Sequence, residues 1–204
     1  MAGGSHGLAQ SASVIVAIAT MDEGAPPTDF DFARTGQGKT GQWRVVADPT
    51  ATAGRAIEQS DADRTDYRFP LAILRSFSAK NVQASVRFKA VAGTVDQAGG
   101  LAVRVLDSDN YYVVRANAME DNVRFYRVVK GKRQELAGAN LRVAGNQWHT
   151  LGLNAEGDTF TILFNGKALF STTDRTFAEA GKVALWTKAD SITRFDQLAL
   201  KALP

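Results

Sequence analysis

The sequence predicts an all-β protein built as an antiparallel β-sandwich, and two observations lead to this prediction. From Gln42 onward, apolar and polar side chains alternate with a period of two in one run after another, which is typical of strands that bury one face. Turn-forming residues separate these runs at short, regular intervals, as in sandwiches of short strands. No long stretch keeps the helical period of about 3.6 residues, which argues against helical and mixed fold classes.

Five runs carry the alternation most clearly. Each is rich in Val, Phe, Tyr or Leu, which favour strands, and they cover residues 83–89, 101–105, 122–129, 159–164 and 181–188. Turn residues bound them at 99–100, 107–110, 120–122, 131 and 156–158. The pair Asn165-Gly166 predicts a two-residue hairpin, because both central positions of a type I′ turn need a positive φ. Residues 176–181 have room for one helical turn at most.

The 204 residues, 45% hydrophobic and 22% charged, fit one globular domain. Residues 1–28 contain no Lys or Arg and are rich in Gly, Ala and Ser, which predicts a flexible N-terminal arm or a trimmed leader before a single domain at 29–204. The apolar run 14–19 ends in Ala17-Ile18-Ala19, like a cleavage site, but lacks a basic start, so this segment leaves export open. The run is too short to span a bilayer, and we expect no transmembrane segment.

Composition excludes several kinds of site. The chain has no cysteine, which rules out disulfides, thiolate zinc sites and cysteine nucleophiles. Its two histidines, His6 and His149, are too few for a three-histidine metal site. The net charge of +3 is modest, and the longest basic run, 130–133, sits at a hairpin. We therefore expect no nucleic-acid partner.

Several segments show a family resemblance. They are 148–153 (WHTLGL), 157–161 (GDTFT), 164–167 (FNGK), 181–186 (GKVALW) and 195–198 (FDQL), supported by 99–104 and 110–115. Together they resemble the concanavalin A-like jelly rolls, in particular laminin G-like domains. More narrowly, the chain is similar to the bacterial 3-keto-disaccharide hydrolase-type family, formerly a domain of unknown function. The resemblance implies a jelly-roll sandwich of the lectin and glucanase type, periplasmic or secreted, that binds or processes carbohydrate.

A face lined by aromatic and basic side chains is the candidate ligand site. If the apolar residues of each strand point inward, the residues left outward include Trp186, Tyr126, Arg104, Arg115, Arg124, Lys188 and Arg87. An aromatic ring would stack on a sugar, and arginines would bind its hydroxyls or a carboxylate. If the arginines share one sheet, an anionic glycan is favoured. The alternative is that these Arg and Lys residues are simply what solvent-exposed strand faces carry, where cations also limit aggregation at sheet edges.

The residues leave open whether the protein is an enzyme, and its catalytic residues are unknown. The Glu-x-Asp-x-x-Glu motif that family 16 glucanases carry on this fold is absent, and the paired acids lie in turns. His149 alternates with Leu151 and Leu153, which predicts a structural, inward-facing ring. Asp31 and Asp196 are candidates for a structural Ca²⁺ site, although no cofactor is required.

The leading hypothesis is an extracytoplasmic carbohydrate-binding or carbohydrate-active domain that recognises a glycan through the basic and aromatic face. One alternative is a hydrolase or lyase of 3-keto-glycosides. In that chemistry the ketone acidifies the neighbouring C–H, so one general base and an arginine suffice. A second alternative is an accessory module that binds a protein partner of unknown identity.

Overall fold

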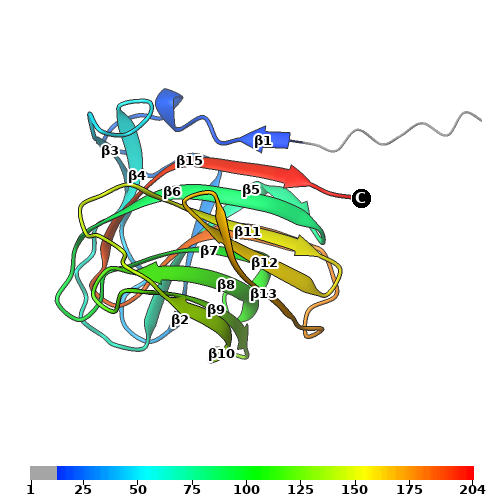
Figure 1. The fold of residues 1–204 in the computed structure, drawn as a ribbon. Helices are drawn as coiled ribbons and strands as arrows, with labels where there is room; N and C mark the ends of the chain where they lie inside the picture. Colours follow the sequence, from blue (N-terminus) through cyan, green and yellow to red (C-terminus); the bar gives the residue numbers. More distant parts are fainter. Residues whose placement is uncertain (1–12) are drawn as a thin grey trace, which may run out of the picture.

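Residues 13–204, which the computed structural model describes, form two antiparallel sheets packed face to face (Figure 1). This confirms the predicted all-β sandwich. The elements are β1 (Ser13–Ile15), η1 (Ile18–Thr20), β2 (Phe30–Gly36), β3 (Trp43–Ala47), β4 (Arg55–Gln59), β5 (Arg68–Ala79), β6 (Val82–Ala92), β7 (Ala98–Asp107), β8 (Asn110–Asn117), β9 (Asn122–Val129), β10 (Lys132–Asn140), β11 (His149–Glu156), β12 (Thr159–Phe164), β13 (Lys167–Thr173), β14 (Gly181–Thr187) and β15 (Ile192–Ala202).

The strand order defines an eight-stranded and a seven-stranded sheet. The eight-stranded sheet runs β13-β12-β11-β6-β15-β4-β3, with β1 added on β15, and the seven-stranded sheet runs β10-β9-β8-β7-β14-β5-β2. The predicted hairpin is confirmed, since Asn165 and Gly166 have φ of 50° and 79° between β12 and β13. Residues 174–180 form bends and extended chain where the sequence left room for a helical turn.

The main core fills the space between the two sheets. Its centre is aromatic: the rings of Tyr112 and Phe125 lie 4.4 Å and 5.0 Å from that of Phe160, measured between centroids. At one edge His149 is buried, and its ring stacks on Phe164 at 5.1 Å. His149 is therefore a packing residue, as predicted.

The segment before residue 29 divides in two. Residues 1–12, which include His6 and the first part of the predicted arm or leader, lie outside the described residues. Beyond them, β1 pairs with β15, and Ile18 and Met21 are buried in the main core. The second half of the predicted arm therefore packs against the sandwich. No helix in residues 13–204 is both long and apolar enough to cross a membrane.

Candidate functional site

The seven-stranded sheet is apolar on its outer face as well as on its inner face. On β14, Leu185 points into the main core, while Ala184 and Trp186 point outward. We call the buried residues on this outer side the outer apolar layer; they are Phe69, Leu71, Ile73, Ala98, Ala102, Val105, Tyr111, Val113, Tyr126, Val128, Ala184 and Trp186. Strands buried on both faces carry near-continuous apolar runs, as β5 and β14 do.

Trp186 lies in this layer and is fully buried, so the expectation of an exposed, sugar-stacking Trp186 is wrong. Its indole stacks on Phe69, with centroids 5.2 Å apart and planes at 16°, and its Nε1 donates to the Tyr111 hydroxyl at 3.2 Å. Gly100 on β7 lies beneath the ring, since a Cβ there would be 3.0 Å from Trp186 Cε3. The residues that contact Trp186 therefore come from strands far from it in the sequence.

Arg133 on β10 covers part of the outer apolar layer. Its guanidinium carbon lies 4.4 Å from the ring centroid of Tyr126, 4.8 Å from that of Phe69 and 6.0 Å from that of Trp186. Its Nη1 atom is buried and finds no hydrogen-bond partner in the described part of the chain. Arg133 is therefore held against ring faces, where a cation is attracted by the negative face of each ring.

Four charged side chains meet beside this layer; we call Asp96, Lys188, Arg115 and Glu120 the acid–base cluster. Lys188 Nζ lies 2.7 Å from Asp96 Oδ2, and Arg115 Nη2 lies 2.8 Å from Glu120 Oε2. Asp96 and Arg115 are buried, whereas the side chains of Lys188 and Glu120 are 16% and 43% exposed. The cluster therefore presents one cation and one carboxylate to solvent, each backed by a buried partner of opposite charge.

Three polar neighbours fix the buried members of the cluster. The Tyr126 hydroxyl lies 3.1 Å from Arg115 Nη2, and the Asn122 side chain also accepts a hydrogen bond from Arg115. Asn117 Nδ2 donates to Asp96 Oδ1 at 2.8 Å. Hydrogen bonds of this kind hold charged groups in one geometry and limit the cost of burying them.

Electrostatics separate the two carboxylates. Burial raises the pKa of Asp96 even though Lys188 and Arg115 favour its charged form. Burial also opposes the ionisation of Glu120, but the Arg115 charge and the Asn122 hydrogen bond outweigh it, so the pKa of Glu120 is lowered. Asp96 is therefore the carboxyl group of the cluster that holds its proton more readily.

A carboxylate behind the cluster fixes the loop that carries Asp96. The buried Asp190 accepts hydrogen bonds from the backbone N–H groups of Thr94, Val95 and Asp96 at 2.8–3.1 Å. Burial opposes the ionisation of Asp190, yet these bonds hold its pKa below the ordinary value. Gly93 has φ of 151°, and a Cβ there would lie 1.8 Å from the Asp96 carbonyl oxygen. Only glycine allows this turn.

The structure gathers five of the seven predicted site residues on the outer side of the seven-stranded sheet. Lys188 and Arg115 belong to the acid–base cluster, and Tyr126 contacts it. Arg124 is on the same face, but its side chain extends across Gly138 to Glu135 on β10, 3.3 Å away. Asp96, Glu120 and Arg133 were missed; the signal available was their polarity at strand ends, which is shared by many ordinary turns.

Arg104 is not on this face, which corrects the prediction. It has φ of 48° within an irregular stretch of β7, where pairing with β8 shifts register. Such a bulge re-aims the side chain. The guanidinium donates to the carbonyl oxygens of Lys80 and Phe177, both at 2.8 Å, and of Gly157, and it stacks on Phe160. Arg104 therefore joins three segments of the chain.

Arg87 points outward as predicted, but from the eight-stranded sheet. It lies 3.0 Å from Asp196 and 4.8 Å from the ring of Trp148. The calcium candidates are also separated, because Asp31 lies on β2 of the other sheet and pairs with Arg75 at 3.3 Å. Within residues 13–204, no group of three or more His, Cys, Asp or Glu side chains is placed to hold a metal ion. A calcium site remains a prediction.

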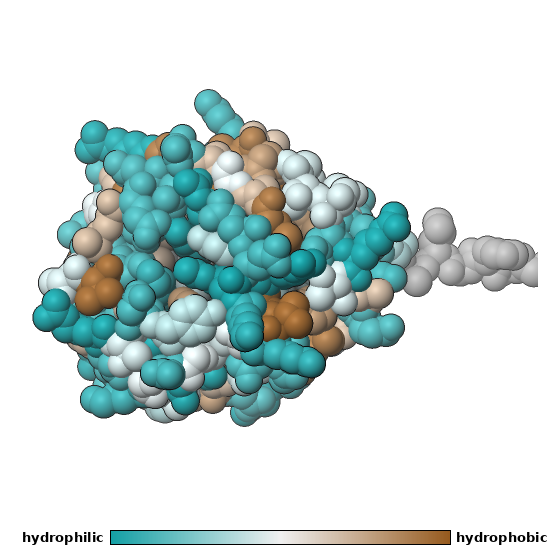
Figure 2. Space-filling model, turned by 90° about the horizontal axis from the view of Figure 1, so that it is seen from below, coloured by the Kyte–Doolittle hydropathy of each residue, from teal (hydrophilic) through white to brown (hydrophobic). Residues whose placement is uncertain are grey.

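The side of the molecule seen in Figure 2 is mainly hydrophilic. Hydrophobic residues are scattered among polar ones, and the visible part of the described surface carries no large apolar patch. Large apolar patches are typical of stable protein–protein interfaces. This side therefore offers more to a polar ligand than to an apolar protein surface.

Comparison with protein families adds a match over most of the chain. A family model described as "Galactocerebrosidase, C-terminal lectin domain" matches residues 72–203. These residues include β6 to β15 and therefore all four members of the acid–base cluster. No curated protein sequence matches the chain.

Solved structures share the fold at low sequence identity. The carbohydrate-binding module CBM66 from Bacillus subtilis is 22% identical, with a TM-score of 0.65 over 84% of this chain and 95% of that chain. A Bacillus subtilis protein of unknown function with a galectin-like fold is 8% identical, with a TM-score of 0.58 over 85% and 89%. The β-glucanase of Bacillus licheniformis is 13% identical, with a TM-score of 0.54 over 86% and 99%. The chain thus has the sandwich of lectins and glucanases.

Proposed function

Because the chain belongs to the family of galactocerebrosidase C-terminal lectin domains, we propose that it is a carbohydrate-binding domain whose acid–base cluster recognises a sugar. The observation that carries this proposal is the pairing of Lys188 with Asp96 and of Arg115 with Glu120 beside the outer apolar layer. We further propose a periplasmic or secreted location, where glycans are encountered; fractionation of cells that express the native gene tests it.

The cluster suits adjacent sugar hydroxyls. A carboxylate accepts hydrogen bonds and an ammonium or guanidinium donates them, so neighbouring hydroxyl groups can satisfy both kinds of partner. Bonds to charged groups are stronger than bonds between neutral ones. The buried partners Asp96 and Arg115 hold the partly exposed Lys188 and the exposed Glu120 in place before the sugar arrives, which reduces the entropy lost on binding.

A neutral sugar fits better than an anionic one. The cluster contains two cations and two carboxylates, and each cation is already paired; Lys188 also lies 3.5 Å from the exposed Asp66. The sequence-based expectation of an anionic glycan depended on unpaired arginines sharing one sheet. In the structure Arg124 pairs with Glu135, and Arg87 lies on the other sheet with Asp196. Electrostatic attraction of an anion to the acid–base cluster is therefore weak.

A glycan array followed by calorimetry tests the proposal. We expect wild type to bind a neutral glycan, and Lys188→Ala and Glu120→Gln each to weaken binding by about 10- to 100-fold, because each removes a charge-assisted hydrogen bond of about 1.5–3 kcal/mol. Glu135→Gln is the matched control, since it breaks a carboxylate–arginine pair on the same sheet outside the cluster. Equal affinities for all four proteins would refute the proposed site.

A second candidate function is cleavage of 3-keto-glycosides, and the raised pKa of Asp96 favours it. A carboxyl group that titrates closer to neutral pH is a better general acid or base. Asp96 would take the proton from the C–H next to the ketone, and Arg115 and Lys188 would stabilise the resulting enolate. The enolate would then break the neighbouring glycosidic C–O bond, and the leaving oxygen would take a proton from solvent. Incubation with a 3-keto-glucoside should then release product with wild type and not with Asp96→Asn. Absence of turnover by the wild type would leave binding as the only function proposed.

A further inference from the structure

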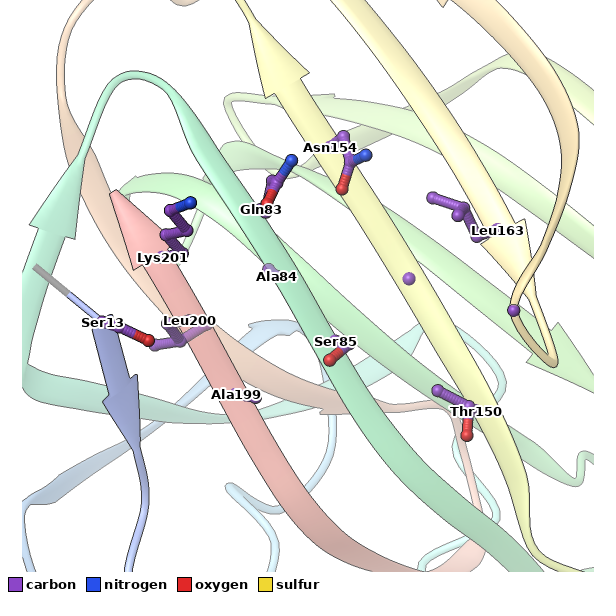
Figure 3. Close-up of a pocket in the computed structure, with 12 residues that line it drawn as sticks. Ser13, Gln83, Ala84, Ser85, Thr150, Asn154, Leu163, Ala199, Leu200 and Lys201 are labelled. Atoms are coloured by element: carbon purple, nitrogen blue, oxygen red, sulfur yellow. The ribbon is translucent and has the colours of Figure 1, made fainter. Parts of the chain in front are cut away.

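A groove crosses the outer face of the eight-stranded sheet, on the other side of the sandwich from the acid–base cluster (Figure 3). Its volume is about 370 Å³, within the usual range of small-ligand sites of about 300–1,000 Å³. Strands β15, β6 and β11 form its floor, and Leu163 of β12 stands at one end.

The groove follows from the register of these strands. Ala199, Ser85 and Gly152 are paired side by side across β15, β6 and β11 and make a row of small residues. The next outward row is Lys201, Gln83 and Asn154, whose side chains are long and polar. Because side chains stand perpendicular to a sheet, a small row beside a long row leaves a channel that runs across the strands.

Irregularities in the strands shape the two ends of the channel. The pairing of β15 with β6 shifts register between Asp196 and Ala199, and that of β12 with β13 shifts between Ile162 and Leu163. Bulges of this kind bend a strand and re-aim its side chains. Leu163 leans over Gly152, where a Cβ would lie only 3.1 Å from the Leu163 Cβ. A larger residue at 152 would therefore fill this end.

Polar side chains line the channel along β6, β11 and β15. Within residues 13–204, the side chains of Gln83, Asn154, Ser85 and Lys201 make no hydrogen bond or ion pair. Elsewhere on the same face the polar groups are engaged: Arg87, for example, is paired with Asp196. Amides, a hydroxyl and an ammonium thus line one groove without a hydrogen-bond partner among the described residues.

We propose that this groove is a second carbohydrate site, which holds an internal segment of a linear neutral oligosaccharide. Its polar groups donate and accept hydrogen bonds as hydroxyl groups require, and no carboxylate is present among the described residues that line it. The backbone groups of β6 and β11 are already paired within the sheet, so a peptide cannot join there as an added strand. The groove is open to solvent, so a sugar chain longer than the groove can continue out of it.

Electrophoresis of the full chain through gels containing soluble neutral polysaccharides (β-glucan, xylan, galactan or fructan) tests this site. We expect one of them to retard wild type. Ser85→Trp fills the channel, and Gln83→Ala with Asn154→Ala removes two amides; each protein should bind about tenfold more weakly or worse, the value expected for two lost neutral hydrogen bonds. Thr173→Trp, on exposed β13 of the same sheet outside the groove, is the matched control and should bind as wild type does.

The same gels, run with Glu120→Gln, distinguish the contribution of the groove to binding from that of the acid–base cluster. If Ser85→Trp weakens binding to a similar extent with and without Glu120→Gln, the groove binds independently of the acid–base cluster. If Ser85→Trp, the double alanine variant and Thr173→Trp have equal mobility, the proposal that the groove binds sugar is refuted. The proposal for the acid–base cluster is not affected by that result. Retardation by none of the polysaccharides, or Ser85-dependent binding of unfolded casein instead, would also overturn it. Circular dichroism establishes that each variant folds. If Ser85→Trp does not fold, the double alanine variant alone tests the groove.

Discussion

Lys188 Nζ lies 2.7 Å from Asp96 Oδ2, so an ammonium group at the end of β14 holds a carboxylate on the loop that follows β6. Asp96 is 1% exposed and Lys188 is partly exposed. Breaking such a pair leaves a buried charge without its partner. The ion pair therefore links the shape of the proposed sugar site to the stability of the fold.

The Asp96 carboxyl should make stability depend on pH. Its pKa is raised by burial, so the folded protein binds this proton more tightly than the unfolded chain, in which Asp titrates at about 3.9. The stability it contributes is complete below that value and is lost as the pH rises through the raised pKa. In urea unfolding, the advantage of wild type over Asp96→Asn should shrink as the pH rises from about 3.5 to 7. Asp66→Asn removes the exposed partner of Lys188 but keeps the Asp96 carboxyl, so this control should keep its own advantage over Asp96→Asn at low pH, as wild type does.

Asp190 should position Asp96 without contacting the sugar. Asp190→Ala removes the acceptor for the N–H groups of Thr94, Val95 and Asp96. We expect these amides to exchange hydrogen about 10- to 100-fold faster, because the lost hydrogen bonds no longer oppose local opening of the loop. Glycan binding should weaken as well. Amides in β12 provide the internal control. Unchanged exchange at residues 94–96 would mean that the loop holds its shape without Asp190.

The Asp48 carboxylate should stabilise the folded protein at pH values above the ordinary pKa of Asp, and this stabilisation should be lost in strong acid. Burial opposes its ionisation, but hydrogen bonds from Lys89, Thr50 and Arg194 hold its pKa well below the ordinary value. The stability gained is present above about pH 4 and is lost as the pH falls towards the folded pKa. Asp48→Asn should lower the free energy of unfolding by about 2–4 kcal/mol at pH 7, since it leaves two cations without their shared carboxylate.

Urea unfolding at several pH values measures this effect. The difference between wild type and Asp48→Asn should narrow as the pH is lowered from about 4 to 2. Glu156→Gln, a change at an exposed carboxylate on β11, should alter stability by less than about 0.5 kcal/mol. A constant difference across this pH range would show that the loss at Asp48 is one of packing rather than of charge.

Arg104 should matter for folding and not for sugar binding. Arg104→Met leaves the carbonyl groups of Lys80, Phe177 and Gly157 without their shared donor, and we expect a loss of at least about 3 kcal/mol. Arg175→Met, at a side chain 88% exposed, should cost less than about 1 kcal/mol. Thermal unfolding and glycan titration of the folded fraction distinguish the roles. If Arg104→Met is stable but has lost affinity for the glycan, Arg104 takes part in sugar binding after all.

The parts of the fold that depend on local sequence could be predicted, and those that depend on distant strands could not. Alternation in residues 122–129 and the Asn165-Gly166 turn are local, and both strands and hairpin are present. Arg104 turns away because β7 is irregular where Gly181 of β14 packs on it; a Cβ at Gly181 would lie 2.5 Å from the Arg104 carbonyl carbon. Nothing near Arg104 in the sequence indicates that contact.

The candidate site shows the same limit. Lys188, Arg115 and Tyr126 could be predicted because alternation places them outward. Asp96 and Glu120 lie in connections whose neighbours are set by strand order, which local alternation does not determine. An alternating pattern also cannot tell an outward residue that meets water from one that other strands cover. For this reason alternation predicts the correct face for Trp186 but not its burial.

The cover over Trp186 can itself be tested through Arg133. Arg133 lies over Tyr126, Phe69 and Trp186, and Arg133→Ala should open a path for water to the outer apolar layer. With the partly exposed Trp148 replaced by Phe, emission comes from the buried Trp43 and Trp186. We expect Arg133→Ala to shift this emission to longer wavelength and to increase its quenching by acrylamide.

The loss of the cation–ring contacts should also lower the free energy of unfolding by about 1 kcal/mol. Arg175→Ala, at an exposed arginine, is the control and should leave the emission unchanged. If Arg133→Ala leaves emission and quenching unchanged, the neighbouring strands alone cover Trp186. If the variant instead gains glycan affinity, Arg133 occupies aromatic surface that a sugar ring can use, and the site of sugar contact extends from the acid–base cluster over Tyr126 and Trp186.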